Sequence, residues 1–377
     1  MLSVSLDVSA VPERPAGAGR YTVDLVRELA VRPDLDLTLV ARTADARRWA
    51  GLAPRASVLA AAPGPRPARL VWEQVALPGV LARQVPPPAV HHGPHYTMPE
   101  RARLPRVVTV HDLTFFDHPE WHERTKVWLF RRAIEVAARA ADAVECVSAV
   151  TADRLRERFA PRAEVVTVPH GVDHARFRPY GAGVPQDADR VALRAHGIEA
   201  PYVAFLGTVE PRKGLDVLVQ AFDTVAGAHP GVKLVVAGGQ GWGAGPVDAA
   251  LRGMRHGDRV TRTGYLPDDV VPALLRAAEV VAYPSRGEGF GLPVLEALAC
   301  GARVVTTTGS AMEELAAGTA ALVPPGDVGA LAAALDAELH DAARAAAPRR
   351  QAGLDVAARY TWRRSADAHV EVYRHVA

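Results

Sequence analysis

The sequence contains little cysteine and no long apolar run. Its 377 residues include only Cys146 and Cys300, which lie far apart and have no CxxC partner. A disulfide framework is therefore not expected; both cysteines are interpreted as small buried residues, and a reducing cytoplasm fits best. No apolar segment is long enough to span a bilayer, and residues 1–10 alternate like a strand and lack the basic start of a secretory signal.

The sequence also lacks a strong charge of either sign. Its 44 basic and 42 acidic residues give a formal net charge of +2, which does not demand a nucleic-acid partner. With 49% hydrophobic and 23% charged residues, the composition is that of a globular protein. Because 377 residues are too many for one ordinary hydrophobic core, two domains are expected.

Short apolar runs alternate with helical patterns through the first half of the chain. Strands are expected at Leu2–Val8, Leu35–Ala41, Val107–Val110, Ala143–Val147 and Val165–Val168. Helices are expected at Tyr21–Val31 and Trp128–Ala141. This alternation predicts a parallel sheet that is covered by helices.

The alternation begins again after residues 177–200, a segment with prolines and glycines that we interpret as the connection between domains. Strands are expected at Tyr202–Leu206, Lys233–Ala237, Val260–Arg262, Val280–Tyr283, Arg303–Thr306 and Ala320–Val323, and helices at Leu215–Ala228, Val270–Ala277, Leu292–Cys300 and Val328–His340. The sequence thus predicts an α/β protein of two doubly wound, Rossmann-like domains, 1–180 and 181–359. Ligands are expected beyond the carboxyl ends of the strands.

The segment Glu288-Gly-Phe-Gly-Leu-Pro-Val-Leu-Glu296 joins an expected strand to an expected helix. Gly289 and Gly291 allow a ligand to approach the backbone closely. The N–H groups at the helix start favour an anion such as phosphate. Because Glu288 precedes the helix and Glu296 lies on its first turns, two carboxylates flank this phosphate site. They suit hydroxyl groups on either side of a diphosphate, one on a sugar and one on a ribose.

Two glutamates eight residues apart around Gly-Phe-Gly-Leu-Pro resemble the signature of retaining glycosyltransferases of the GT-B fold, family 4. The resemblance implies two Rossmann-like domains facing each other across a cleft, with a C-terminal helix, here 360–377, that crosses back to the first domain. It implies that Glu288 contacts the donor sugar and Glu296 the ribose. The implied donor-binding residues are Gly207, Arg212, Lys213, Glu288, Gly289, Phe290, Gly291, Leu292 and Glu296.

Two adjacent cations, Arg212 and Lys213, follow the expected strand Tyr202–Leu206. Cations at this place can meet a diphosphate, and an arginine can bind two oxygens at once. In the family that the chain resembles, this pair holds the donor phosphates and neutralises the leaving group.

Weaker matches lie in the first half. Gly17 and Gly19 follow the first expected strand and resemble the family's N-terminal glycine loop, which faces acceptor and donor. His111 and Asp112 end the strand Val107–Val110, and the family often has His-Asp here, with the histidine near the reacting sugar. The resemblance therefore implies a catalytic role for His111 beside Glu288, Arg212 and Lys213, and a lesser role for Asp112.

Two further segments match the family only in part. His170, in Pro169-His170-Gly171-Val172-Asp173, replaces the commoner asparagine, and we interpret this segment as a turn that links the domains. Met312, in Ala311-Met312-Glu313-Glu314, replaces the usual proline. The nearby Ser310 is expected close to the donor.

The resemblance also implies a reaction that retains the configuration of the donor's anomeric carbon. No carboxylate pair like that of a retaining glycosidase is evident, so a front-face route is expected, in which the departing phosphate takes the acceptor's proton. No metal or other cofactor is expected, because GT-B enzymes commonly work without one. Asp34 and Asp36 have metal-binding spacing, but they begin a strand, away from its carboxyl end.

The donor and the acceptor are less defined. Three segments resemble bacterial mannosyltransferase-like members: Glu210-Pro-Arg-Lys213, Trp72-Glu73-Gln74 and residues 92–96. This resemblance favours GDP-mannose as the donor and leaves UDP- or ADP-linked glucose open. The acceptor is expected to be a hydroxyl of a glycan, a lipid-linked sugar or a small molecule, bound by loops of the first domain.

Basic and aromatic residues gather around the helix Trp128–Ala141 and could touch an anionic membrane surface. A solvated helix with a buried apolar face is the favoured explanation of these residues. The residues are Trp121, Arg124, Lys126, Trp128, Arg131, Arg132 and Arg139. The expected location is the cytoplasm, with peripheral contact at the inner face of the membrane as an open alternative.

Three other functions were weighed. A sugar-nucleotide epimerase of the same fold would turn over the donor alone. A non-catalytic nucleotide-sugar-binding protein is disfavoured by the presence of Glu288, Arg212, Lys213 and Glu296. A dinucleotide-dependent dehydrogenase is disfavoured because no G-x-G-x-x-G follows the first strand.

Overall fold

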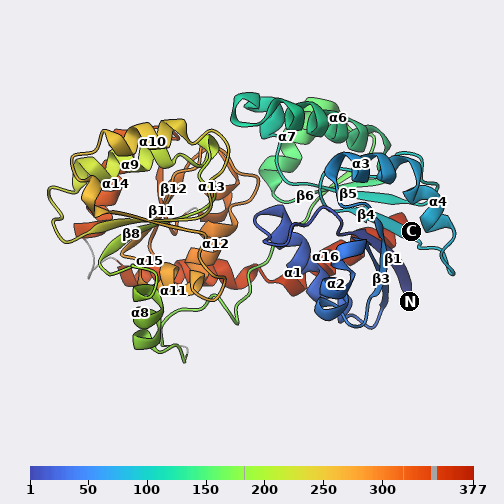
Figure 1. The fold of residues 1–377 in the computed structure, drawn as a ribbon, viewed down its shortest axis with the longest axis horizontal. Helices are drawn as coiled ribbons and strands as arrows, with labels where there is room; N and C mark the ends of the chain where they lie inside the picture. Colours follow the sequence, from blue (N-terminus) through green and yellow to red (C-terminus); the bar gives the residue numbers. More distant parts are fainter. Residues whose placement is uncertain (182, 317, 341–345) are drawn as a thin grey trace. The chain divides into compact units, whose positions relative to one another are not determined.

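The computed structural model of the protein describes residues 1–181, 183–316, 318–340 and 346–377, and these form two α/β units (Figure 1). The first unit comprises Met1–Asp117, Arg124–Gly171 and Trp362–Ala377. The second comprises His118–Glu123 and Val172–Thr361. The chain therefore passes between units after Gly171, before the predicted boundary at residue 180, and its last helix belongs to the first unit.

The described residues of the first unit hold a seven-stranded parallel sheet in the order β3-β2-β1-β4-β5-β6-β7. The strands are β1 (Leu2–Asp7), β2 (Leu35–Arg42), β3 (Ser57–Ala62), β4 (Val90–Gly93), β5 (Arg106–Val110), β6 (Ala143–Cys146) and β7 (Glu164–Thr167). The helices are α1 (Ala18–Ala30), α2 (Ala46–Leu52), α3 (Arg66–Val75), α4 (Leu77–Ala82), α5 (Thr114–Asp117), α6 (Arg124–Ala140), α7 (Ala149–Phe159) and α16 (Trp362–Val376). The strand order reverses at β1, so the carboxyl ends of β1 and β4 form the place where such sheets bind ligands.

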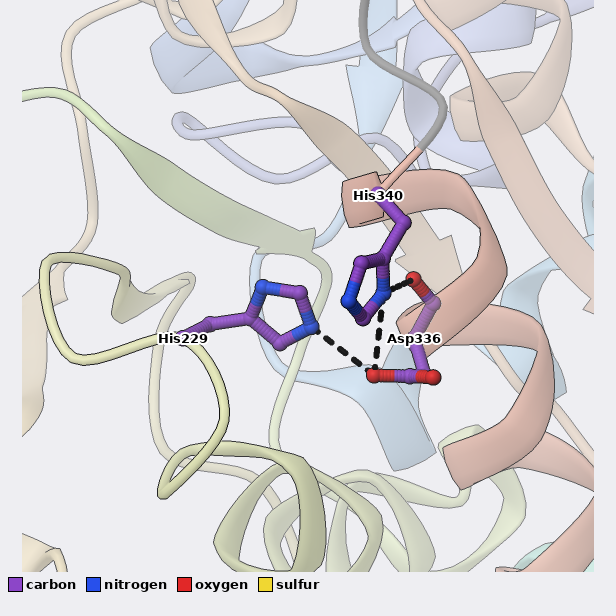
Figure 2. A group of neighbouring side chains, drawn as sticks. All are labelled: His229, Asp336 and His340. Atoms are coloured by element: carbon purple, nitrogen blue, oxygen red, sulfur yellow. Dashed lines mark hydrogen bonds and ion pairs between the residues drawn. The ribbon is translucent and has the colours of Figure 1, made fainter.

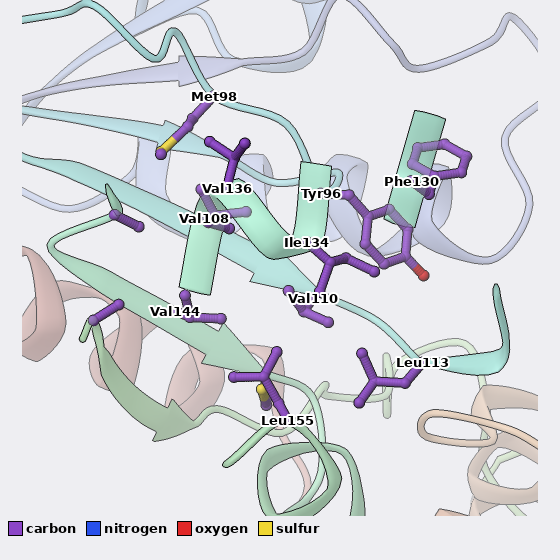
Figure 3. Close-up of a cluster of buried hydrophobic side chains, with 14 of the residues drawn as sticks. Tyr96, Met98, Val108, Val110, Leu113, Phe130, Ile134, Val136, Val144 and Leu155 are labelled. Atoms are coloured by element: carbon purple, nitrogen blue, oxygen red, sulfur yellow. The ribbon is translucent and has the colours of Figure 1, made fainter. Parts of the chain in front are cut away.

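The core of this unit lies between the sheet and its helices. Figure 3 shows aliphatic side chains of β5 and β6, among them Val108, Val110 and Val144, packed with Ile134 of α6. These β-branched residues suit a strand that is covered by helices, because they pack well on a pleated surface. Aromatic rings close the cluster at one end, where Tyr96 and Phe130 lie with ring centroids 4.9 Å apart.

The described residues of the second unit hold a six-stranded parallel sheet in the order β10-β9-β8-β11-β12-β13. Its strands are β8 (Tyr202–Leu206), β9 (Lys233–Ala237), β10 (Val260–Gly264), β11 (Val280–Tyr283), β12 (Val304–Thr307) and β13 (Ala321–Val323). Its helices are α8 (Gln186–Arg194), α9 (Leu215–Val225), α10 (Gly245–Arg252), α11 (Val271–Ala277), α12 (Leu292–Ala299), α13 (Ala311–Ala316), α14 (Val328–His340) and α15 (Ala346–Arg359). Here the order reverses at β8, which is flanked by β9 and β11.

The sequence-based expectations agree with this architecture in most elements. Every predicted strand is present, and both cysteines are buried free thiols. The pattern missed β3 and β4, and it missed α2, α3, α4, α5, α7, α10, α13 and α15. In β4, a strand of four residues, two buried histidines stand where a pattern search requires apolar residues. The first helix begins at Ala18, earlier than the predicted Tyr21, because Gly17 precedes it with a positive φ of 50°.

A buried polar network attaches α16 to the first sheet. Glu145, on β6, has its Oε2 atom 3.4 Å from His92 Nε2 and 3.3 Å from His369 Nε2. The hydroxyl of Tyr373 lies 2.6 Å from His92 Nδ1, and that of Tyr21 lies 2.9 Å from His369 Nε2. Because His369 and Tyr373 belong to α16, directional contacts fix the helix against β4, β6 and α1.

Burial keeps this network uncharged. Removal from water raises the pKa of Glu145 well above its usual value, and it lowers the pKa of His92 and, to about 4, that of His369. Burial thus favours the neutral forms of the carboxyl and the imidazoles, and hydrogen bonds from Tyr373, Thr109 and Tyr21 contribute to the network. Such groups stabilise a fold only while each keeps its partner.

We expect Tyr373→Phe to destabilise the first unit by about 1–3 kcal/mol, because it leaves His92 Nδ1 buried without its partner. Urea denaturation followed by circular dichroism would measure the loss. Tyr360→Phe is the matched control, since among the described residues no hydrogen bond to the Tyr360 hydroxyl is observed. Equal midpoints for the two variants would show that the Tyr373 hydroxyl contributes nothing.

Candidate active site

The backbone after β8 follows a path that is fixed by close contacts. Gly207 donates its N–H to the carbonyl of Ala237, at 2.9 Å. A Cβ atom on Gly238 would lie only 2.0 Å from the carbonyl oxygen of Gly207. The segments that follow β8 and β9 therefore pack so closely that only glycine fits at Gly238. Gly207 thus has a packing role at the carboxyl ends of the strands, where ligands are expected.

A single turn of 3-10 helix, Pro211–Lys213, carries the two predicted cations. It ends at Gly214, which has a φ of +64° and whose added Cβ would lie 2.1 Å from the carbonyl oxygen of Pro284. Pro284 directly follows β11, the strand that pairs with β8. The loops after these two strands are thus packed against each other, and they bring Arg212 and Lys213 beside Glu288.

The carboxylate of Glu288 is the centre of the resulting cluster. Arg212 Nη1 donates to its Oε2 atom at 2.7 Å, and Lys213 Nζ donates to its Oε1 atom at 2.5 Å. Ser285 Oγ and the Tyr283 hydroxyl also donate to Oε1, at 2.8 and 3.1 Å. The side chains are nearly inaccessible, with 10% of Glu288, 12% of Lys213 and 15% of Arg212 exposed.

Opposing effects set the charge of this cluster. Burial raises the pKa of Glu288, but Arg212 and Lys213 outweigh it and lower that pKa to about 2. Burial, with the neighbouring Arg212, lowers the pKa of Lys213, while Glu288 counteracts the shift. The carboxylate is therefore ionised at any physiological pH, and it serves as the counter-ion of two buried cations.

A second carboxylate completes the charge balance. Glu210 accepts a hydrogen bond from Arg212 Nη2 at 3.0 Å, and 27% of its side chain is exposed. Two cations and two carboxylates give no net charge. A diphosphate that binds to Arg212 and Lys213 must therefore compete with the carboxylates that these cations already contact.

The start of α12 forms the other side of the site. Gly291, which precedes the helix, has a φ of +100°, and its added Cβ would lie 2.9 Å from Met312 Cγ. Close approach to Met312 thus requires glycine at this position. Leu292 and Pro293 begin the helix, whose first N–H groups and dipole favour an anion. Gly289 and Phe290 connect this helix start to Glu288, and Phe290 is buried with its ring 5.9 Å from that of Tyr360.

Glu296 and Ser310 are both buried in the same unit. Glu296 lies on α12 with 8% of the residue exposed. Ser310 directly precedes α13, and its Oγ atom accepts a hydrogen bond from the N–H of Met312 at 3.4 Å. Met312 in turn receives a hydrogen bond from Thr306 at its sulfur, at 3.3 Å. The methionine that replaces the family's usual proline is therefore part of the packing beneath Gly291.

Sequence analysis missed three residues of this cluster. The sequence places Tyr283 only at the end of an expected strand, and no role is expected there for Ser285 or Glu210. Tyr283 ends a buried strand, where its hydroxyl points beyond the sheet edge toward Glu288. A polar group at the carboxyl end of a buried strand is the signal that could have identified it.

In the first unit, His111 lies beyond the end of β5. It is buried, and its Nε2–H donates to the backbone carbonyl of Pro94 at 2.8 Å. Burial lowers the pKa of His111, although this hydrogen bond opposes the shift. Rings of Tyr21, Tyr96 and His170 surround it, with centroids 5.1, 5.4 and 5.8 Å away. The structure therefore places a neutral imidazole in an aromatic setting at the sheet edge.

The remaining first-unit candidates have local structural roles. Asp112 Oδ1 accepts hydrogen bonds from the N–H and hydroxyl of Thr114, at 3.0 and 2.6 Å, so it caps the start of α5. Gly17 precedes α1, and Gly19 lies in its first turn, where an added Cβ would be 3.3 Å from Pro15 Cβ. His170, predicted to lie in a linking turn, is buried, and its ring is 4.5 Å from that of Tyr21.

Known proteins resemble both units. A family model described as "Glycosyltransferase Family 4" matches residues 15–176, and one described as "Glycosyl transferases group 1" matches residues 200–341. The crystal structure of Anabaena HepE in complex with UDP-glucose superposes over 100% of both chains, with a TM-score of 0.78 and 18% identity. The chain is a family 4-like glycosyltransferase of the GT-B fold.

Sequence relatives of this glycosyltransferase include mannosyltransferases. It is 28% identical over 288 residues to "O-antigen chain mannosyltransferase B" of Escherichia coli, which covers 76% of this chain and 74% of the relative. It is 36% identical over 197 residues to the "GDP-mannose-dependent alpha-(1-6)-phosphatidylinositol monomannoside mannosyltransferase" of Mycobacterium tuberculosis. The latter match spans 49% of each chain, so the glycosyltransferase aligns with only about half of that relative.

We expect Glu288→Gln to increase the affinity of this glycosyltransferase for a free nucleoside diphosphate by about tenfold. The change removes the counter-ion with which the diphosphate competes and leaves Arg212 and Lys213 without it. Isothermal titration with GDP, UDP or ADP would measure the change.

Glu210→Gln is the matched control, because Glu210 contacts the same arginine but is more exposed; a smaller gain is expected. The corresponding nucleoside, which lacks phosphates, should bind Glu288→Gln and wild type equally. Weaker diphosphate binding by Glu288→Gln would mean that Glu288 supports the bound ligand rather than competing with it.

Proposed function

We propose that this glycosyltransferase moves a hexosyl group from a nucleotide diphosphate sugar to a hydroxyl acceptor, with retention of the anomeric configuration. The observation that carries the proposal is the cluster of Arg212, Lys213 and Glu288 beside the start of α12. It combines two cations, a helix start that favours anions and an ionised carboxylate. These are the groups that a sugar diphosphate requires: charge for the phosphates and an acceptor for a sugar hydroxyl.

Arg212 and Lys213 would stabilise the leaving nucleoside diphosphate. In the proposed front-face reaction, the bond from the anomeric carbon to the phosphate oxygen breaks, and a bond to the acceptor oxygen forms on the same face. The acceptor's hydroxyl proton passes to the departing phosphate. Negative charge grows on this phosphate as the bond breaks, so fixed cations stabilise the transition state more than the bound donor. The two side chains supply this charge, and we propose that the transfer itself uses no bound metal.

Glu288 would orient the donor sugar once the diphosphate has displaced it from the cations. In the cluster with Arg212 and Lys213 its pKa is about 2, so it enters the reaction ionised, as a hydrogen-bond acceptor for sugar hydroxyls rather than a general acid. Glu296 would bind the ribose from α12. His111, kept neutral by burial, would contribute from the first unit near the reacting sugar, and the acceptor would bind to loops of that unit.

GDP-mannose is the proposed donor. One relative is named as GDP-mannose-dependent and another as a mannosyltransferase. The UDP-glucose in the HepE structure concerns a protein that shares the fold at 18% identity. Donor choice is therefore tested directly, with UDP- and ADP-linked glucose as the alternatives.

A thermal-shift panel of GDP, UDP, ADP and their sugar conjugates would identify the donor. We expect GDP and GDP-mannose to raise the melting temperature, because a ligand that binds only the folded state stabilises it. A shift with UDP or ADP alone would replace the proposed donor and retain the site. No shift with any of them, well above micromolar concentration, would contradict a nucleotide-sugar site.

With the donor known, two variants test the roles of the glutamates. Glu288→Ala should lower turnover strongly without weakening nucleotide binding, because it removes a contact to the reacting sugar and not one to the nucleotide. Glu296→Ala should mainly weaken nucleotide binding. If both behave like wild type, the assignment is wrong. Conversion of the donor alone to an epimer would identify an epimerase, and binding without transfer or hydrolysis a non-catalytic protein.

We also propose peripheral contact of α6 with an anionic membrane surface. Trp128 is 69% exposed on this helix. Arg131 donates to the carbonyl of Phe115 at 2.7 Å and Arg132 pairs with Glu100 at 3.0 Å, so both are engaged by the protein. Across the described residues, the structure has no helix long and apolar enough to cross a membrane. Contact would therefore rest mainly on Trp128.

Sedimentation with anionic liposomes at low salt tests this contact. We expect the wild type to co-sediment and Trp128→Ala to bind less, because an exposed indole is favourable at a lipid interface. Trp242→Ala, a change at another exposed tryptophan, is the control. No binding of the wild type would remove membrane contact from the proposal.

A further inference from the structure

Three metal-ligating side chains meet on the second unit, away from the cluster described above. His229 lies in the turn between α9 and β9, and Asp336 and His340 lie one helical turn apart on α14 (Figure 2). His229 Nε2 is 2.8 Å from Asp336 Oδ1, and His340 Nδ1 is 3.3 Å from the same oxygen. Two imidazole nitrogens thus converge on one carboxylate oxygen.

The separations fit a tetrahedral metal site. Zinc binds imidazole nitrogen and carboxylate oxygen at about 2.0–2.2 Å, which places neighbouring ligand atoms about 3.3 Å apart in a tetrahedron. One atom from each of the three residues lies within 4.8 Å of the others. The two nitrogen–oxygen separations are already close to this value, and the two nitrogens, which lie within 4.8 Å, would need to approach each other by at most about 1.5 Å to enclose an ion. The i, i+4 spacing of Asp336 and His340 presents both ligands on one face of α14.

The exposure of the residues matches an open three-ligand site. His229 is held in place with 11% of its side chain exposed, whereas Asp336 and His340 are 45% and 64% exposed. His229 therefore provides a fixed ligand, and the solvent side leaves room for water as a fourth ligand. Two nitrogens and one oxygen suit a borderline divalent transition metal better than Mg²⁺ or Ca²⁺, which prefer oxygen ligands alone.

The hydrogen bonds observed among these residues compete with metal binding but do not prevent it. His340 Nδ1 also lies 2.9 Å from the backbone oxygen of Asp336, and the rings of His229 and His340 are 4.6 Å apart at their centroids. To bind a metal through Nδ1, His340 must carry its proton on Nε2, and the metal bond then replaces the contact to the carbonyl. Such a change of tautomer is available to any neutral imidazole.

The position of this group indicates a structural rather than a catalytic role. His229 precedes β9, and His340 is the last residue of α14. In a parallel sheet the amino ends of all strands lie at one end and the carboxyl ends at the other. The three ligating residues lie near the amino end of β9, and the Glu288 cluster lies at the carboxyl ends of β8 and β11, so the two are at opposite ends of the strands. A metal at this edge cannot contact the donor phosphates.

We propose that His229, Asp336 and His340 bind a divalent transition metal, with Zn²⁺ the first choice, which ties the end of α14 to the turn before β9. The metal would hold together two segments that are separated by 107 residues in sequence. Binding to the folded chain alone would stabilise the second unit by mass action.

Thermal unfolding of the full, tag-free chain after EDTA treatment tests this site. We expect ZnCl₂ at about a hundredfold excess over its dissociation constant to raise the melting temperature by about 5 °C or more, and MgCl₂ to leave it unchanged. Isothermal titration should give one Zn²⁺ per chain. The absence of a Zn²⁺-dependent rise would overturn the proposal.

Variants assign the ligands. His340→Ala and Asp336→Asn should abolish the Zn²⁺-dependent rise while leaving the melting temperature of the metal-free protein close to that of the wild type, because both side chains are largely exposed. His196→Ala removes an exposed histidine elsewhere in the same unit and should retain the full rise. An undiminished Zn²⁺ effect in His340→Ala and Asp336→Asn would place the metal elsewhere and refute the assignment.

Discussion

The attraction between Glu288 and the cations Arg212 and Lys213 is the interaction on which the rest of the candidate site depends. Two adjacent buried cations are costly unless each has a partner, so the loop after β8 can hold them only where a carboxylate is supplied. That carboxylate comes from the loop after the neighbouring strand β11. A contact that only glycine permits, between Gly214 and Pro284, brings these loops close enough for the pairing. The pairing of β8 with β11 therefore brings Glu288 to the two cations, and the ion pairs in turn stabilise the loops that follow these strands.

This arrangement determines what a diphosphate must do to bind to Arg212 and Lys213. Arg212 and Lys213 are largely buried, and the carboxylates of Glu288 and Glu210 already neutralise their charge. A ligand anion exchanges one set of ion pairs for another, and the free energy gained is the difference between the two. Displacement of Glu288 would then release a carboxylate at the moment when the sugar arrives, so that binding the diphosphate and orienting the sugar become linked steps.

The sequence predicted the site where chemistry is carried by neighbours along the chain, and failed where it is carried by neighbours in space. The nonapeptide from Glu288 to Glu296 and the Arg212-Lys213 pair were found because each is a continuous segment. Tyr283 and Ser285 became visible as partners of Glu288 only in the folded chain. In the same way, the parallel sheets followed from alternating apolar runs. The strand β4 did not, because its buried histidines are satisfied by residues as distant as Tyr373.

The position of α16 has a consequence for how the molecule is made. The first unit includes residues 362–377, which the ribosome adds only after the whole second unit. Until then, Glu145 and His92 lack the contacts that His369 and Tyr373 make with them. During synthesis, every residue of the second unit has been added by Thr361, whereas the first unit must wait for residues 362–377. Although it is translated first, the N-terminal half is completed last.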